Sequence, residues 1–574
     1  MKVALHNAFF GKAVAETEIS RRLTVAASRL GWEAKEVGTS AEIDAWRPDF
    51  VVALHFFTPK LTRFPTYGCM WNPPGFMESN QDHLRAVLSY DAYLTSGDTI
   101  TEWVRDLSYG FEKQTFFAPF YASCLDGAWR APLLEAPRLV YLGTNWDGER
   151  HPQLFQDLSE RPFFDVYGPA GRWPSAAVAY RGPLPFDGAT VTDVLNRSGV
   201  GLCFHRAEHR EAGIPNARIF EIVSSGALAI CEEHPFVRQT FGDSVLYLPA
   251  AADADATCAS IDDQMAWIRS HRAEALEMSR RAHAIFSRSF SLEKLLANVG
   301  REHERLTESK GSSEDHPPQT QGHVQVVIRT AGRSSRMLSR ALKSISAQTY
   351  RDVSVLIVRR GTPDIAEALA SCPSHLEVEM VDLPSAASRS ESLWAGLKAA
   401  KAVYVANLDD DDEWFPNHLA TLVPLVAPGR RTAVAYSGAV RQFEQDDRSA
   451  PPLPSEPATL LYHHPFDRDR LLTLDNYITS NAWIARRELI DGIGDDPRLL
   501  VLEDLALLLR FAEATDFAFS GEVTVRFFER TSATDNTRHL PPSVWEQARE
   551  RIRRMLWKSG LVRPQKSSPA QTGS

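Results

Sequence analysis

The sequence lacks any run of apolar residues long enough to cross a membrane. No stretch of its 574 residues reaches about 18 consecutive apolar residues, so we expect no transmembrane helix. The first 22 residues meet Glu16 and Glu18 too early for the apolar core of a signal peptide. We therefore expect a cytoplasmic protein, for which peripheral association with a membrane surface stays open.

Paired cysteines are absent as well. No two of the six cysteines form a C-x-x-C pair, so the sequence contains no zinc-binding or redox motif of that kind. We expect reduced, mostly buried thiols. The six are Cys69, Cys124, Cys203, Cys231, Cys258 and Cys372.

The sequence also has no excess of positive charge. Its 63 Lys and Arg face 73 Asp and Glu, which gives a formal net charge of −10. Non-specific binding to nucleic acid requires clustered Lys and Arg that displace counterions, so we expect no nucleic-acid partner. A local basic pocket for a phosphorylated ligand is compatible with this charge.

A polar segment divides the chain into two halves. Residues 307–322, TESKGSSEDHPPQTQG, contain no aliphatic or aromatic residue. Such a segment cannot bury enough surface to offset its ordering entropy, so we interpret it as a linker. The last residues, 561–574, have the same character and are expected to form a flexible tail.

Short apolar runs alternate with helical patterns in both halves, which predicts an α/β protein with parallel sheets. The pattern restarts after Pro137, so we expect two Rossmann-like domains, 1–136 and 137–306, that face each other across a cleft. Residues 323–560 repeat the theme once and are expected to form one further Rossmann-like domain with a mixed sheet. The runs include 3–6, 50–56, 138–143, 199–204, 324–330, 353–359 and 403–408.

Four consecutive carboxylates, Asp409 to Asp412, directly follow the apolar run 403–408. Open α/β sheets bind ligands at the carboxyl ends of their strands. Four adjacent anions repel one another and need a counter-charge, which Mg²⁺ or Mn²⁺ supplies in many phosphate sites. The alternative interpretation is an acidic, solvated turn before the next helix.

Three segments of the back half resemble family 2 glycosyltransferases, which have the GT-A fold. The first, 326–358, contains the S-x-x-x-Q-T-Y turn of that family at Ser344, Gln348, Thr349 and Tyr350. The second, 387–423, leads into a D-x-D motif at Asp409–Asp411 that is followed by Trp414 and Pro416. The third, 499–511, contains the acidic pair Glu503 and Asp504.

This resemblance implies a metal-dependent, inverting transferase. Asp409, Asp411 and Asp412 would hold Mn²⁺ or Mg²⁺ against the leaving diphosphate. Asp504, with Glu503 beside it, would take the proton of the attacking hydroxyl as general base. The interpretation of Asp504 as an ordinary first-turn acid of a helix stays open.

The donor contacts implied for this half are Thr330, Arg389 and Asp364. Here the sequence departs from the family. Arg359 and Arg360 stand where the family carries acidic residues that contact the nucleoside, and arginine cannot accept a hydrogen bond. Asp364 is the nearby carboxylate that could substitute.

The segment 200–249 of the front half resembles the donor-binding domain of GT-B enzymes, specifically the family 4-like group with the CgeB-type proteins. The resemblance implies that Glu221 binds the nucleotide ribose and that Arg218, Gly226 and Arg150 serve the diphosphate without a metal. The first glutamate of the usual family 4 pair has no counterpart, so the catalytic residue of this half is unassigned. The shared core is Gly213, Pro215, Arg218, Phe220, Glu221 and Gly226.

Together the resemblances imply a bifunctional glycosyltransferase with a GT-B and a GT-A module. It would transfer sugars from nucleotide-sugar donors to a glycan, lipid-linked or protein-linked acceptor in bacterial polysaccharide or glycoprotein assembly. Three alternatives stay open. Only the back half catalyses and the front half docks carbohydrate; only the front half catalyses; or paired carboxylates hydrolyse a glycoside.

Overall fold

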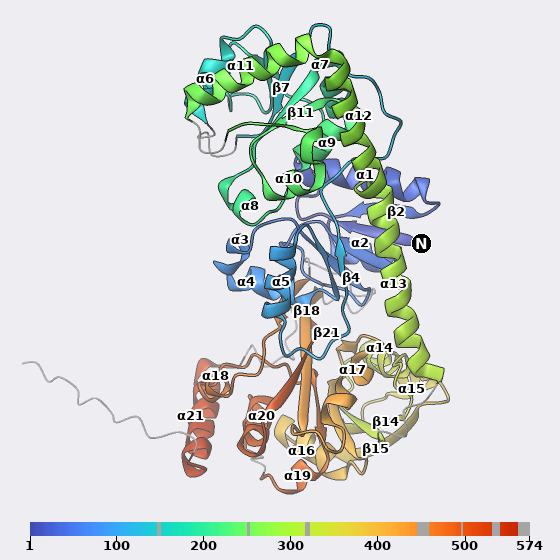
Figure 1. Cartoon of the computed structure of the whole chain (residues 1–574). Coiled ribbons are helices and arrows are strands. Elements are labelled where there is room, and N and C mark those ends of the chain that lie inside the picture. Colours follow the sequence, from blue (N-terminus) through green and yellow to red (C-terminus); the bar gives the residue numbers. More distant parts are fainter. Residues whose placement is uncertain are drawn as a thin grey trace, which may run out of the picture. The chain divides into compact units, whose positions relative to one another are not determined.

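The computed structural model describes residues 1–145, 151–249, 253–315, 322–444, 458–494, 498–530 and 540–560 (Figure 1). The chain divides into two compact units. The first unit comprises 1–59, 64–109 and 114–308, and the second comprises 60–63, 110–113 and the residues from 309 onward.

The first unit contains two six-stranded parallel sheets, with strand orders β2-β1-β3-β4-β5-β6 and β12-β11-β10-β7-β8-β9. The first sheet consists of β1 (Lys2–His6), β2 (Glu33–Val37), β3 (Phe50–Ala53), β4 (Thr66–Met70), β5 (Ala92–Thr95) and β6 (Phe117–Pro119). The second consists of β7 (Arg138–Leu142), β8 (Phe164–Tyr167), β9 (Tyr180–Gly182), β10 (Gly199–Cys203), β11 (Leu228–Cys231) and β12 (Leu246–Tyr247). The two expected Rossmann-like sheets are confirmed.

Helices cover both faces of these sheets, which is why central strands such as β3, FVVA, and β11, LAIC, are buried and apolar throughout. Those that accompany the first sheet are α1 (Ala15–Arg29), α2 (Ser40–Trp46), α3 (Gly75–Glu78), α4 (Gln81–Ser89) and α5 (Asp98–Leu107). Those that follow are α6 (Pro152–Ser159), α7 (Thr190–Ser198), α8 (Ala207–Glu211), α9 (Ala217–Ser225), α10 (Pro235–Phe241), α11 (Ala254–Ser270), α12 (Arg272–Ser289) and α13 (Leu292–Asp315). Two 3-10 turns complete the unit, η1 (Pro174–Ala176) and η2 (Gly242–Ser244).

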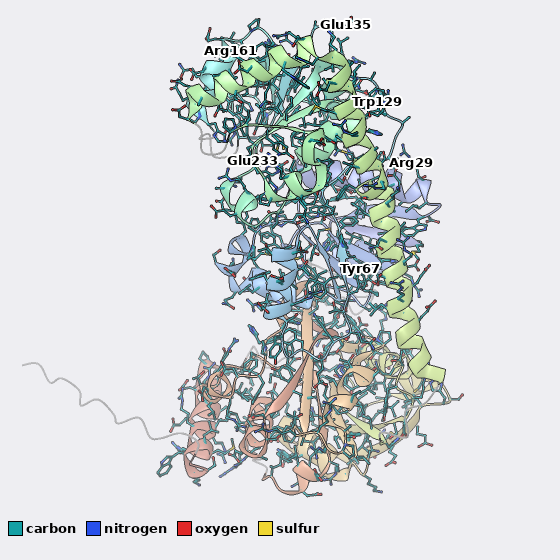
Figure 2. The ribbon with its side chains drawn as sticks, viewed as in Figure 1. Arg29, Tyr67, Trp129, Glu135, Arg161 and Glu233 are labelled. Atoms are coloured by element: carbon teal, nitrogen blue, oxygen red, sulfur yellow. The ribbon has the colours of Figure 1, made fainter. Side chains whose placement is uncertain are left out.

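The last helix, α13, returns to the first sheet. Leu296 and Val299 are fully buried in the core of that sheet, and the hydroxyl of Tyr67, labelled in Figure 2, lies 2.7 Å from Nδ1 of His303. The sequence analysis placed this stretch at the end of domain 137–306. It also expected a linker from residue 307, whereas α13 stays helical to Asp315.

The second unit is built on one nine-stranded mixed sheet, in the order β15-β14-β13-β16-β20-β18-β21-β17, with β19 paired to β18. The four strands β15, β14, β13 and β16 run parallel, and β20 pairs antiparallel with β16. The strands are β13 (Val324–Thr330), β14 (Val353–Arg360), β15 (Glu377–Leu383), β16 (Tyr404–Asp409), β17 (Glu413–Trp414), β18 (Val434–Glu444), β19 (Thr459–Tyr462), β20 (Trp483–Arg486) and β21 (Phe517–Arg530). A parallel part extended by antiparallel strands confirms the expected GT-A-type fold class.

Two hydrophobic cores cover the two faces of this sheet. Alternate residues of β13 point to opposite faces, so Val326 packs in the core with α14 and α17, whereas Val327 packs in the core with α16 and α20. The helices are α14 (Ser335–Ser346), α15 (Ala366–Ala370), α16 (Arg389–Ala399), α17 (His418–Val426), α18 (Arg468–Leu472), α19 (Glu488–Asp491), α20 (Glu503–Ala514) and α21 (Pro542–Lys558).

None of the described helices has the length and apolar content that a bilayer span requires. The expected cytoplasmic location stays a prediction.

Candidate active sites

The carboxyl ends of β13 and β16 meet at one edge of the sheet in the second unit. The strand register pairs Arg329 with Asp409. One residue further along, Thr330 Oγ1 donates a hydrogen bond to Asp410 Oδ2 at 2.7 Å. Arg333, in the loop after β13, lies 2.5 Å from Asp410 Oδ1. Thr330 therefore lies beside the aspartates, and its predicted contact with the donor stays a prediction.

Arginine side chains supply much of the counter-charge to the four aspartates. Arg329 Nη2 donates to Asp409 Oδ1 at 2.8 Å. Arg530, at the end of β21, donates to Asp411 Oδ2 at 2.7 Å, and Arg333 lies 3.1 Å from the same oxygen. These pairs are partly or fully buried, so removal of one partner would leave the other charge uncompensated, which is more destabilising than at an exposed ion pair.

The remaining oxygens of Asp409 and Asp412 also have partners within the chain. Ser480 Oγ donates to Asp409 Oδ2 at 2.8 Å. Asp412, buried at 6 % exposure, accepts from the Asn481 amide at 2.5 Å and from the Phe528 backbone N–H at 2.8 Å. Both carboxylates therefore help to fix the loop after β16.

A divalent cation fits this edge through a single carboxylate. Asp411 is 13 % exposed and has one oxygen, Oδ1, to which the described residues give no hydrogen bond. Among those residues, no three of the clustered carboxylates bring ligand oxygens within 4.8 Å of one another. Mg²⁺ and Mn²⁺ often bind through one or two carboxylates plus substrate phosphates, so Asp411 fits such an ion, whereas the expected set of three aspartates does not assemble.

Burial and neighbouring charges shift the pKa values of the aspartates in different directions. Burial opposes ionisation of Asp409, but Arg329 and Arg389 outweigh it and hold the pKa of Asp409 below its ordinary value. Burial and then the charges of Asp411 and Asp409 raise the pKa of Asp412 well above its ordinary value. The aspartates of the cluster therefore differ in their affinity for a proton.

The two acidic residues at the start of α20 also differ in their burial and in their hydrogen-bond partners. Glu503 is 3 % exposed and accepts from Arg329 Nη1 at 2.8 Å and from Arg389 Nε at 2.9 Å. Asp504 is half-buried, and the Asn476 amide lies 3.5 Å from its Oδ2. Burial, followed by the charge of Glu503, raises the pKa of Asp504. Glu503 is thus a positioning residue, and Asp504 is the carboxylate of the pair suited to proton transfer.

The two arginines that replace family carboxylates have other partners. Arg359, on β14, pairs with Asp382 on β15 at 2.7 Å. Arg360 donates to the carbonyl of Ala387 at 3.3 Å. Asp364 is exposed and accepts from the backbone N–H of Ala366, so it holds the start of α15. A donor contact by Asp364 stays a prediction.

The Q-T-Y turn, one of the motifs on which the resemblance rests, holds a neighbouring segment in place. Gln348 is fully buried and donates to the carbonyl of Phe415 at 2.8 Å, while its Oε1 accepts from the Leu419 N–H at 3.0 Å. Thr349 N–H donates to the carbonyl of Pro416 at 2.8 Å. The turn fastens the segment that follows the aspartates to the end of α14.

The first unit contains a cavity of about 930 Å³. Its walls come from the loop after β1, from α1, from the ends of β7 and β8, and from the start of α9. The expected cleft between the two Rossmann-like sheets is present, at the strand ends where such folds bind ligands. The volume lies within the range of small-molecule sites.

Glu221 and Arg218 both line this cavity. Glu221 is 5 % exposed and pairs with Arg218 and, at 2.8 Å, with Arg22 of α1. Burial opposes its ionisation, but the two arginines outweigh burial and lower its pKa. Asn216 caps the start of α9 by accepting from the Arg218 N–H at 3.0 Å.

Two other predicted residues are not found at the cavity. Gly226 does not line it but ends α9 with φ of 83°, where a Cβ atom would lie 2.2 Å from the Arg130 carbonyl. Its glycine identity is explained by this close approach. Arg150 lies outside the described residues.

Sequence reasoning missed three charged residues of α1. Arg22 is 1 % exposed and joins Glu221 to Glu18, whose other oxygen accepts from the Gly188 N–H at 2.9 Å. Glu16 lines the cavity, and burial raises its pKa. The acidic first turn of α1 was visible in the sequence, but nothing there indicated that it faces α9.

Two regions of the sequence match family models. Residues 325–494 match "Glycosyl transferase family 2", and residues 150–299 match "Glycosyl transferase-like". Both resemblances and the glycosyltransferase enzyme class are thereby confirmed. Asp504 lies beyond the first match, and Glu221 lies inside the second. No curated protein matches the sequence.

Solved structures of S. aureus TarS are similar to part of the chain. TarS 1–349 is 14 % identical, with a TM-score of 0.30, and the match covers 40 % of this chain and 64 % of that one. The longer TarS structure is 13 % identical, with a TM-score of 0.30, and 39 % of it is covered. TarS 1–349 in complex with UDP-GlcNAc is 14 % identical, with a TM-score of 0.31, and 65 % of it is covered, against 40 % of this chain. The chain thus spans less than two thirds of the length of each.

Proposed function

We propose that the chain is a nucleotide-sugar-dependent glycosyltransferase with two transfer sites, one in each unit. The observation that supports this best is the pairing of arginines with carboxylates in both units, on helices that line the cavity in the first and at strand ends in the second, where a diphosphate can be bound. The two family matches lie on these two regions separately.

In the first unit, the donor would occupy the cavity without a metal. The ribose hydroxyls donate to Glu221, and the diphosphate accepts from Arg218 and from the N-terminal amides of α9. Arg22 holds Glu221 ionised, because its guanidinium is buried against that carboxylate. Charged donors on the protein stabilise the negative charge that grows on the leaving diphosphate.

Glu16 is the candidate proton acceptor in this cavity. The other cavity-lining carboxylates have polar partners: Glu18 and Glu221 pair with Arg22, and Glu36 accepts from the Asn7 amide at 2.6 Å. The raised pKa of Glu16 moves it towards neutral pH, where a general base is most effective.

In the second unit, Asp504 would accept the proton of the attacking hydroxyl. Attack from the face opposite the leaving diphosphate inverts the anomeric centre. Arg333 and Arg530 would lie against the diphosphate, where they already share Asp411. Their positive charge compensates the charge of the departing nucleotide.

A divalent cation, Mn²⁺ or Mg²⁺, would be held by Asp411 together with the donor diphosphate. When bound, it adds positive charge at the leaving oxygens. Because Asp411 alone offers few ligand atoms, we expect weak binding of the ion without nucleotide. An Asp411→Asn variant should lose the stimulation by Mn²⁺, whereas Asp382→Asn, on the exposed edge strand β15, should keep it.

The acceptor class follows from the enzyme class. We propose that the two sites add successive sugars to one glycan, lipid-linked or protein-linked, of a bacterial surface polysaccharide or glycoprotein. The linker that joins the two units would raise the effective concentration of the first transfer's product for the second transfer.

The test is a panel of nucleotide sugars and glycan acceptors on the full chain, with EDTA or with Mn²⁺. We expect one transfer that persists in EDTA and a second that increases with Mn²⁺. A single transfer under all conditions would contradict the two-site proposal and favour a docking role for one unit. Release of free sugar from an oligosaccharide without a donor would instead indicate a hydrolase.

A further inference from the structure

The second sheet of the first unit places two cysteines side by side at its carboxyl edge. The parallel register of β10 and β11 pairs Cys203 with Cys231, the last residue of each strand. A histidine follows each of them, His205 two residues later and His234 three residues later. The pattern is C-x-H on one strand and C-x-x-H on its neighbour.

The side chains converge and are buried. Ligand atoms of Cys203, His205 and Cys231 all lie within 4.8 Å of one another, and within the described part of the chain no other group of His, Cys, Asp or Glu does so. In a tetrahedral zinc site the Zn–S distance is about 2.3 Å, which puts the two sulfurs about 3.8 Å apart. Small rotations of these side chains therefore reach zinc geometry.

The surroundings of His205 are those of a metal ligand. Its Nδ1 lies 3.3 Å from Glu232 Oε1, and Glu232 is in turn paired with Arg210 at 2.8 Å. Both ring nitrogens of His205 are buried and have no hydrogen-bond partner, which is rare for buried polar atoms. Glu232 lies close enough to Nδ1 to accept from it when Nε2 binds a metal.

His234 is the candidate fourth ligand, and it lies outside the group whose ligand atoms already converge. It is 1 % exposed, and its ring centroid lies 4.0 Å from that of His205. The loop that carries it, 232–234, runs from the end of β11 to the start of α10 (Figure 2 labels Glu233). Rotation of this ring towards the sulfurs closes a ligand set of two thiolates and two imidazoles.

We propose that Cys203, His205, Cys231 and His234 form a structural zinc site. Thiolate and imidazole ligands favour Zn²⁺ over the hard cations of carboxylate sites. Binding replaces the two thiol protons, which are released to solvent, and leaves no open position on the ion. The site is separate from Asp411 in chemistry and in location.

The zinc site would stabilise the start of α9. The Asn216 amide, from the residue that caps α9, donates to the carbonyl of Phe204, which lies between the ligands Cys203 and His205, at 2.8 Å. The hydrogen bond that the Cys203 thiol donates to Oδ1 of Asn216 at 3.6 Å is given up when zinc replaces the proton. Helix α9 carries Arg218 and Glu221 to the cavity. The ion would thus hold the donor side of the cavity in place without touching the donor.

The test is the zinc content of the full chain, purified under reducing conditions and exposed to Zn²⁺. We expect about one tightly held zinc per chain, at least tenfold less in Cys203→Ser and Cys231→Ser, and the wild-type amount in Cys258→Ser. Cys258 is the matched control, because it is also a buried cysteine of the first unit, at 3 % exposure. It lies on α11, in a different hydrophobic core from Cys203 and Cys231.

X-ray absorption of zinc in the wild-type chain keeps the proposal testable if the variants fail to fold. We expect two sulfur ligands at about 2.3 Å and two nitrogen ligands at about 2.0–2.1 Å. Absence of bound zinc, equal zinc in Cys231→Ser and Cys258→Ser, or a Cys203–Cys231 disulfide in the untreated protein would each overturn the proposal.

Discussion

Neighbouring carboxylates in the second unit differ because of the arginines around them. Glu503 is held ionised between Arg329 and Arg389, while Asp504, one residue later, is half-buried with a raised pKa. Only the second therefore has the freedom and the proton affinity that a general base needs. The sequence motif singled out both residues but could not separate their surroundings, and their catalytic roles stay predictions.

Loss of this base should be severe. We expect Asp504→Asn to lower kcat/KM of the metal-stimulated transfer by about 10²–10⁴, the usual contribution of general base catalysis. Glu367→Gln, which changes an exposed carboxylate on α15, is the matched control and should change the rate little. Equal rates for Asp504→Asn and the wild type would exclude Asp504 as the base.

The pH dependence of this transfer should report the surroundings of Asp504. A base must be ionised, so activity falls as the pH drops through its pKa, which is raised above the ordinary aspartate value of about 3.9. Glu503→Gln removes a negative neighbour, so the pKa of Asp504 falls and the acid limb of the kcat/KM profile moves to lower pH. A shift to higher pH, measured on protein with native circular dichroism, would be the wrong sign for this account.

The partners of the aspartates could not be predicted from the sequence. Arg530 and Asp411 are 119 residues apart, and Arg340, which donates to the Asp411 carbonyl, is 71 residues away. A run of four acids suggested a metal as counter-charge because arginines so distant give no local signal. The same limit hid the link between Arg22 and Glu221, which are 199 residues apart.

At the scale of elements, the periodic patterns were the reliable signal. Alternating strands and helices predicted three sheets, because a parallel strand pair needs a crossover that leaves a helical pattern in the sequence. Strand register had no such signal, so the pairing of Cys203 with Cys231 was not foreseen. The return of α13 to the first sheet was missed for the same reason.

This return of α13 has a measurable consequence for stability. Leu296 is fully buried against the first sheet, so Leu296→Ala should lower the free energy of unfolding by about 2–5 kcal/mol. Arg301→Ala, on the exposed side of the same helix, should change it by less than about 0.5 kcal/mol. Chemical denaturation of the full chain measures both, and equal effects would mean that α13 does not pack as described.

The turn at the end of α14 gives a second prediction at this scale. Gln348→Ala leaves the buried Leu419 N–H without its partner, at about 1–3 kcal/mol, and removes one of the two hydrogen bonds to the Phe415 carbonyl, which keeps the His418 N–H. We expect a lower melting temperature and a higher KM for donor in the second unit, because the segment after the aspartates is no longer fastened. Lys343→Ala, exposed on the last turn of the same helix, is the control.

At the scale of the whole molecule, the chain joins two units whose sites use different chemistry. The first has Arg218 and the start of α9 in a cavity, where we propose that the donor diphosphate binds, and the second combines arginines with Asp411 at a sheet edge. Each of the two regions matches a glycosyltransferase family model. Whether both transfer sugar is the central claim of the account.

Transfer products of two single variants test that claim most directly. The full chain, Glu221→Gln and Asp504→Asn are each given the same acceptor glycan and donor mixture, and the products are identified by mass spectrometry. We predict that the wild type adds two sugars and that each variant loses a different one of the two transfers. Unchanged products from Glu221→Gln, or loss of both transfers in Asp504→Asn when each is assayed on its own acceptor, would contradict two independent sites.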